Sequence, residues 1–297
     1  FKEWKSLVMD YPVLDDEPLE ENTYLSASYV VGSSLDTTLN VAFSVLEYVL
    51  LDAPGAPVKQ ALLDAHVGKD ISGSYEDSTC QPFFTIEAKN AKEEDRERFL
   101  TVIRETLEKL TQEGLDRKAL ASGINFFEFR FREADYATFP KGLIYGIELF
   151  VSWLYDDDRP FDYLKQLSVF EELKQKAEEG YFEGLIRKYL LENSHGADVV
   201  LRPRRGLAAR KEAEEAEKLA AYKASLGREE LEELVRQTKA LKEYQESEET
   251  PEALACIPLL QRSDISRKTP VALRTEKADA DGTDVLYHDY FTNGIGY

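Results

Sequence analysis

The sequence predicts an α+β fold: a two-layer α/β domain with a mostly antiparallel sheet covered by helices, followed by a long antiparallel helical hairpin. Strand and helix patterns alternate up to Pro203, which favours a mixed domain. From about Arg205 to Glu249 the chain is rich in Ala, Glu, Lys and Leu and almost free of Phe. The composition changes again after Pro251. We therefore predict an α/β domain at 1–204, a helical hairpin linker at 205–250 and the start of a following α/β domain at 251–297.

Composition and charge narrow the class of protein. Of 297 residues, 43% are apolar and 11% aromatic, enough for a sizeable core. A formal charge of −20 repels phosphate and anionic lipid, so we expect no nucleic-acid or membrane partner and a preference for basic peptides. No apolar run approaches the roughly 20 residues of a membrane span, and the first residues lack a signal-peptide pattern. Two cysteines and no N-x-S/T site favour a reducing, cytoplasmic setting.

The first half of the mixed domain shows clear strand and helix signals. Thr23–Val31 is typical of a strand, and Leu35–Leu51 of an apolar helix that Ser33, Ser34 or Asp36 could cap. A short helix is expected next, followed by two strands joined by a polar turn, at Val58–Ala65, Asp70–Tyr75 and Pro82–Ala88.

The second half is mostly helical. Asn90 and Glu93 resemble a capping pair before a helix that ends at Gly114, and its apolar face comprises Phe99, Val102, Ile103, Leu107 and Leu110. Helix is expected through most of Leu115–Tyr189, with breaks near Phe139-Pro140, Asp156–Pro160 and Gly180, and a closing strand at Ala197–Leu201. Phe127–Arg132 alternates with period two while the preceding residues favour helix, so periodicity alone leaves this segment open.

The charged segment after Arg205 predicts two helices that join at Gly227. Apolar residues recur on one face of each predicted helix, at Leu207, Leu219, Tyr222 and Leu226, and at Leu231, Leu234, Val235, Leu241 and Tyr244. These stripes are narrow, so the hairpin is expected to pack across a larger body. Near the end, Asp279–Thr283 predicts a turn before an edge strand in VLYHDYFTNGIGY.

Several long segments resemble one protein family in the same order. TYLSASYVVGSS and LLDAPGAPVKQALLDAHVGKDISGSYEDSTCQPFFTIEAKN are similar to the second domain of the presequence protease branch of the insulinase-like zinc metallopeptidases (pitrilysins, or inverzincins). FREADYATFPKGLIYGIELFVSWLYDDDRPFDYL and EGYFEGLIRKYLLENSHGADVVLRPRRGL continue the resemblance. It covers most of Tyr11–Leu207, after which the hairpin falls where that branch carries its helical linker, and DYFTNGIGY resembles the opening strand of a third domain.

The resemblance implies a division of labour. In this family, four related α/β domains form two halves that close around an unstructured peptide, and the inverted zinc motif lies in the first domain. None of the zinc ligands and no catalytic base maps onto this chain, so we assign no catalytic and no metal residue here and leave substrate-binding residues unassigned. The expected partners are unstructured peptides and the remaining domains of the same polypeptide, and zinc is expected only in the parent enzyme. The resemblance also favours a helix for Phe127–Arg132.

The histidines agree with this assignment. His66, His195 and His288 are the only three, and no H-x-x-E-H or H-E-x-x-H motif sets two imidazoles on one helical face. We expect His66 at a helix end, His195 in a helix-to-strand turn beside Gly196, and His288 facing solvent.

Other chemistry-bearing residues have a structural and a functional interpretation. Asp156, Asp157 and Asp158 could hold a cation, although a solvated loop is favoured, and Cys80 and Cys256 could pair, although two thiols are favoured. Arg202, Arg204 and Arg205 could grip an anion but are expected to neutralise nearby acidic residues. We predict a core that includes Phe43, Leu46, Val49, Ile147, Phe150 and Trp153, some of which could instead line a peptide chamber.

These observations favour a non-catalytic fragment of a zinc metalloendopeptidase, which forms a chamber wall and the hinge between the two halves. The alternative is a self-standing, catalytically inactive binding or assembly module of the same ancestry. A metal-dependent hydrolase built on Asp156–Asp158 has little support from the sequence.

Overall fold

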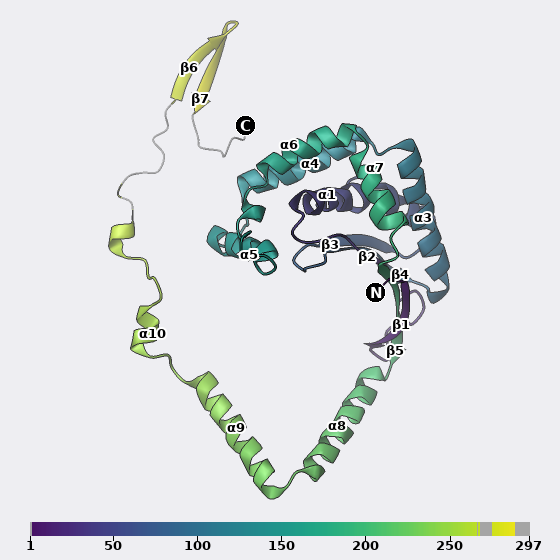
Figure 1. The fold of residues 1–297 in the computed structure, drawn as a ribbon, viewed down its shortest axis with the longest axis vertical. Coiled ribbons are helices and arrows are strands. Elements are labelled where there is room, and N and C mark those ends of the chain that lie inside the picture. The colour runs from purple at the N-terminus through teal and green to yellow at the C-terminus, as the bar shows by residue number, and fades with distance from the viewer. Residues whose placement is uncertain (1, 266, 268–274, 289–297) are drawn as a thin grey trace. The chain divides into compact units, whose positions relative to one another are not determined.

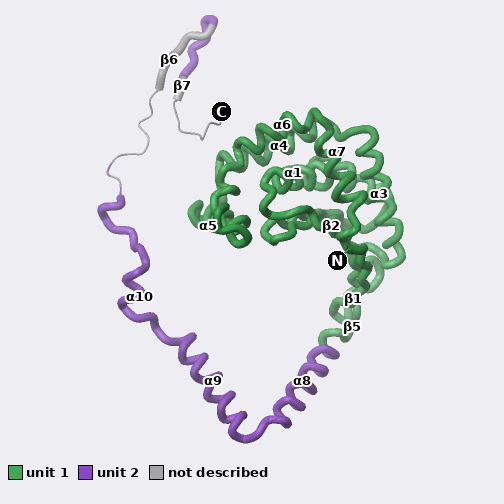
Figure 2. The backbone as a smooth tube through the Cα atoms, viewed as in Figure 1, with its two compact units in different colours: residues 1–208, 293–297 green, residues 209–292 purple. Residues whose placement is uncertain are grey.

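The computed structural model describes residues 2–265, 267 and 275–288. Contacts separate one unit, Phe1–Ala208, from a second unit that begins at Ala209 (Figure 2). The first unit contains one five-stranded sheet covered by helices (Figure 1), which confirms the predicted α+β fold class. The assignment of 251–297 to a following domain stays a prediction.

The sheet is mostly antiparallel, as predicted. Its strand order is β1-β5-β2-β4-β3, and only the β1–β5 pair among these strands is parallel. The strands are β1 (Lys5–Val13), β2 (Thr23–Val30), β3 (Asp70–Glu76), β4 (Phe83–Ala91) and β5 (Gly196–Arg205). Residues from both ends of the domain therefore meet at one edge of the sheet.

Seven α-helices of this unit cover one face of the sheet. They are α1 (Thr37–Glu47), α2 (Pro57–Asp64), α3 (Arg96–Glu113), α4 (Arg117–Glu133), α5 (Lys141–Trp153), α6 (Leu167–Glu178) and α7 (Tyr181–Ile186). A π-helical turn, Tyr48–Asp52, extends α1, while α4 and α6 lie side by side beyond it (Figure 1). The segment Phe127–Arg132 lies inside α4, so helix wins over the alternating pattern, as the resemblance implied.

The two predicted helix caps have different outcomes. The Asp36 side chain accepts a 3.0 Å hydrogen bond from the backbone N–H of Leu39 and caps α1, as predicted. The predicted cap at Asn90 is wrong, because β4 continues to Ala91 and pairs there with Thr23 of β2. A 3₁₀ turn, Glu93–Asp95, then precedes α3. Sheet pairing therefore outweighs the local capping signal.

The core lies between the sheet and the helices. Alternate residues of β2 are buried, and Ala27 of β2 pairs with Ile86 of β4, so both side chains point to the helix-covered face. Phe43 of α1 and Phe84 of β4 are fully buried there, with ring centroids 6.0 Å apart. Phe43, Leu46 and Val49 are core residues, as predicted.

One helical stretch corrects the expectation about apolar runs. Thr37–Asp64 is long and apolar enough to span a membrane by length and composition. More than half of its most apolar window is buried inside the domain, where α1 and the π-helical turn supply core residues. Its composition is therefore explained by core packing.

The prediction that α5 contributes to the core is wrong for three residues. Ile147, Phe150 and Trp153 are 54%, 49% and 43% exposed, and only Val151 and Ser152 of this helix are buried. The pattern correctly identified an apolar helix face, but this face has no cover among the described residues.

The second unit contains two long helices and a short hairpin. α8 (Leu207–Ser225) and α9 (Arg228–Glu246) confirm the predicted helices and the break at Gly227, which is the N-cap of α9 and whose N–H donates to Glu230. Leu219, Tyr222 and most other apolar side chains of the two stripes are exposed, so their antiparallel packing stays a prediction.

Beyond the long helices, α10 (Pro251–Ala255) precedes β6 (Thr275–Ala280) and β7 (Thr283–His288), which pair around the predicted turn. The rest of the predicted edge strand, 289–297, lies outside the described residues.

Strand β1 was not predicted, and a buried carboxylate holds it in place. Asp198 of β5 pairs with Ser6 of β1 and is 2% exposed. Its side chain accepts hydrogen bonds from Trp4 Nε1 (2.6 Å), Ser6 Oγ (2.7 Å) and Arg96 Nε of α3 (2.5 Å). Burial alone would raise the pKa of Asp198, but these bonds, chiefly from Arg96, hold it below its usual value.

We predict that Asp198→Ala lowers the free energy of unfolding by about 3 kcal/mol, because it leaves Arg96, Ser6 and Trp4 without their shared acceptor. Chemical denaturation measures this change. The matched control is Glu97→Ala, since Glu97 is the exposed second partner of Arg96 at 3.4 Å, and it should change stability by less than about 0.5 kcal/mol. Equal losses in the two variants would contradict the role given to Asp198.

Candidate functional site

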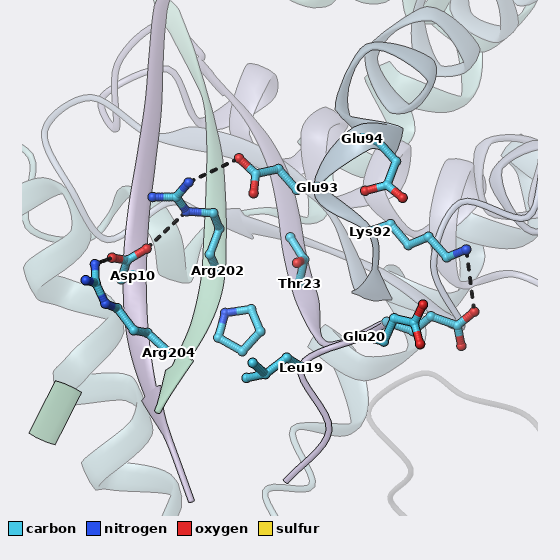
Figure 3. Close-up of a pocket in the computed structure, with 11 residues that line it drawn as sticks. Asp10, Leu19, Glu20, Thr23, Lys92, Glu93, Glu94, Arg202 and Arg204 are labelled. Carbon is cyan, nitrogen blue, oxygen red and sulfur yellow. Dashed lines mark hydrogen bonds and ion pairs between the residues drawn. The ribbon is translucent and has the colours of Figure 1, made fainter. Parts of the chain in front are cut away.

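The largest described pocket lies where β1 and β5 end, beside the start of α3 (Figure 3). It is open and has a volume of about 550 Å³. Five carboxylates and three cationic groups line it: Asp10, Glu20, Glu21, Glu93 and Glu94, with Lys92, Arg202 and Arg204. Because acidic groups outnumber basic ones, the pocket is a poor site for an anion.

Strand register brings two arginines onto one carboxylate. Asp10 of β1 lies opposite Arg202 of β5, and Arg204 is two residues further along the same face. Arg202 Nε donates to Asp10 Oδ1 at 3.0 Å, and Arg204 Nη1 donates to Asp10 Oδ2 at 2.6 Å. The Arg204 bond, together with Arg202 and against partial desolvation, holds the pKa of Asp10 below its usual value. Asp10 is therefore a poor general base.

Further contacts neutralise the remaining charges around the pocket. Arg202 Nη1 lies 3.4 Å from Glu93, while Lys69 Nζ lies 2.7 Å from Glu21. Arg205 donates to the backbone carbonyl of Glu17 at 2.6 Å. The three arginines thus bind groups of their own domain, which confirms the prediction that they neutralise acidic residues. α8 begins directly after this ion-paired edge, at Leu207.

The other residues singled out in the sequence do not assemble into a site. His66 has a positive φ of 56° after α2, and His195 precedes β5 in a turn where its N–H donates to Asn193. His288 lies in β7, and its side chain is outside the description. Within residues 2–265, 267 and 275–288, no group of three or more His, Cys, Asp or Glu side chains could hold a metal ion.

The aspartate cluster and the cysteines follow their structural interpretations. Asp156 accepts a 3.0 Å hydrogen bond from the backbone of Asp158 in an exposed loop after α5. Cys80 and Cys256 are free and exposed.

Sequence analysis missed the two carboxylates that organise the β1–β5 edge. A signal was present, since Asp10 and Asp198 each interrupt an apolar strand pattern, in LVMDYPV and GADVVL. A charged residue at such a position is expected to have a partner. What the sequence could not show is that the two strands are neighbours.

Comparison with known proteins defines the class of this chain. Residues 2–126 match the family model described as Peptidase M16 inactive domain, and residues 201–297 match the model for the segment associated with subfamily C of the same peptidases. The chain therefore carries an inactive peptidase domain of the M16 zinc protease family, followed by the segment associated with it.

Relatives refine this assignment. The chain is 37% identical over its whole length to Protein HypA of Clostridium perfringens and 36% identical to Presequence protease 1, chloroplastic/mitochondrial, of Arabidopsis thaliana. It spans 30% and 28% of their lengths. A crystal structure of a peptidase M16 inactive domain from Pseudomonas fluorescens is 13% identical, with a TM-score of 0.45 over 68% of this chain and 44% of that one. The chain belongs with the presequence protease branch of the insulinase-like metallopeptidases.

We predict that Asp10→Asn loosens the β1–β5 edge, because Arg202 and Arg204 lose their shared carboxylate. Hydrogen exchange of β1 amides should accelerate relative to wild type at neutral pH. Since the folded-state pKa of Asp10 is depressed, its contribution is present above the unfolded value near 4 and is lost as the pH falls through the folded value. The difference between variant and wild type should therefore vanish in acid.

Glu20→Gln is the matched control, because Glu20 lines the same pocket and is exposed. Its β1 exchange should follow wild type at every pH. A difference between Asp10→Asn and wild type that persists unchanged in acid would contradict the titration of Asp10 as its cause.

Proposed function

We propose that this chain forms a non-catalytic wall of a peptide chamber and the root of a hinge in a larger zinc metalloendopeptidase that degrades unstructured peptides. The exposed apolar stripe of α5 carries this proposal. Leu143, Ile147, Phe150 and Leu154 recur at helical spacing and are 52%, 54%, 49% and 64% exposed. A continuous apolar stripe of this kind is typical of a surface that contacts another polypeptide.

The branch to which the chain belongs supports the rest of the proposal. In the parent enzyme, zinc and a catalytic glutamate would come from other domains, where the metal polarises the peptide carbonyl and activates water. The chain spans less than a third of its two relatives, which leaves room for such domains. The ion-paired β1–β5 edge directly before α8 would give a hinge a firm base. A cytoplasmic location remains our proposal from composition.

We predict that the purified chain does not cleave a quenched peptide library in the presence of zinc, and that a longer polypeptide including the flanking domains does. Addition of a chelator should abolish the second activity, because the metal performs the chemistry. Chelator-sensitive cleavage by the chain alone would overturn the non-catalytic assignment. An equally inert longer protein would instead support the alternative, an inactive binding module.

We predict that Leu143→Ser in the longer enzyme lowers kcat/KM for peptides by severalfold, because it interrupts the apolar stripe of α5. Thermal stability of the isolated chain should stay the same, since Leu143 is half exposed and supports no core contact there. Leu14→Ser is the matched control, as Leu14 is 67% exposed and lies outside α5. Equal activity in both variants would remove α5 from the peptide-handling surface.

A further inference from the structure

A second cavity, distinct from the arginine pocket, lies among α1, α4, α5 and the turn after β3. Its volume is about 240 Å³, below the roughly 300 Å³ at which pockets for drug-sized ligands begin. A cavity of this size suits a single side chain. Its lining combines three carboxyl groups with aromatic rings: Asp77, Asp135 and Glu148, with Phe131, Tyr136 and Tyr163.

The carboxyl groups come from three separate segments. Asp77 follows β3, Asp135 follows α4, and Glu148 lies in α5. Among the described residues, no salt bridge reaches Asp77 or Glu148, while Asp135 accepts one hydrogen bond from the backbone of Ala137 at 3.0 Å. Burial raises the pKa of Asp77, and burial together with the charge of Asp77 raises the pKa of Glu148. A nearby cation would relieve both costs.

One cation already lines the cavity, but it is directed elsewhere. The Arg130 guanidinium lies 5.6 Å from the centroid of the Phe126 ring in a cation–π contact. Within the described part of the chain it forms no ion pair with the three carboxyl groups. With all groups ionised, three negative charges face one positive charge, so the cavity favours a further cation.

The aromatic wall is partly fixed by hydrogen bonds. The Tyr163 hydroxyl donates to the Ser34 carbonyl at 2.7 Å and accepts from Asn40 Nδ2 at 2.6 Å, and Tyr163 is 3% exposed. Its ring is therefore held in one orientation. Aromatic faces attract ammonium and guanidinium groups, and the attraction grows when the cation is shielded from water. The aliphatic part of a long side chain would also bury apolar surface against Phe131.

We propose that this cavity binds one alkylguanidinium or alkylammonium group, with Asp77 and Glu148 as its counter-charges and Tyr136 and Tyr163 as aromatic walls. A free amine and a lysine or arginine side chain of a peptide share this chemistry. The inference does not rest on the proposed peptidase role, because binding is a property of this chain alone.

NMR titration of the purified chain tests the proposal with butylguanidinium and with the peptide acetyl-Ala-Arg-Ala-amide. We expect saturable shifts confined to residues around the cavity. Shifts with both probes identify the free cation as sufficient, and shifts with the peptide alone identify a peptide side chain as the ligand. The neutral citrulline analogue of the peptide should bind at least about tenfold more weakly, because it lacks the charge-assisted contacts.

Variants separate the cavity from general attraction to an acidic protein. Asp77→Asn and Glu148→Gln should each weaken binding about tenfold, and Arg130→Gln should strengthen it because it removes the resident cation. Glu171→Gln is the matched control, since Glu171 is exposed on α6 outside the cavity and removes the same charge. Equal binding of the citrulline peptide, or equal losses in Glu171→Gln and Glu148→Gln, would overturn the proposal.

Discussion

The architecture of this domain depends on the buried carboxylate of Asp198. β1 is an edge strand with a single neighbour, β5, and most of its side chains are exposed. It therefore gains little from the hydrophobic contacts that hold β2 and β4 in the centre of the sheet. Asp198 compensates by joining β1, β5 and α3 through hydrogen bonds from Ser6, Trp4 and Arg96. A charge that is costly to bury becomes stabilising because every bond it accepts comes from a different part of the fold.

The same strand pair explains the only concentrated basic segment of an acidic chain. Asp10 lies on the same face of β1 as Ser6, and Arg202 and Arg204 lie on the same face of β5 as Asp198. The two carboxylates thus fasten the edge at two levels. The arginines are occupied by these contacts, so a motif that could bind anions in another setting acts here as internal reinforcement at the start of α8.

How much the sequence could predict followed from whether a pattern was local. The buried residues of β2 alternate, so its strand and its inward face were predictable, and Asp36 was predictable as a cap because the cap and its partner are three residues apart. β1 was missed because three successive exposed apolar residues, Leu7, Val8 and Met9, carry no alternation. The cation cavity was also out of reach, since Asp77 and Glu148 are distant in the sequence and meet only through packing.

The misassignment of α5 is the more instructive error, because the periodicity itself was correct. An apolar face indicates that a helix is built to be covered, but the pattern does not state by what. Burying a side chain such as Leu143 or Phe150 would contribute about 1.5–3 kcal/mol, and this contribution is not realised within the described residues. The domain therefore combines an edge whose charges are satisfied internally with a helix whose apolar face is not. That asymmetry is expected of a domain that acts as one wall of a larger protein, with α5 on the side that receives a partner.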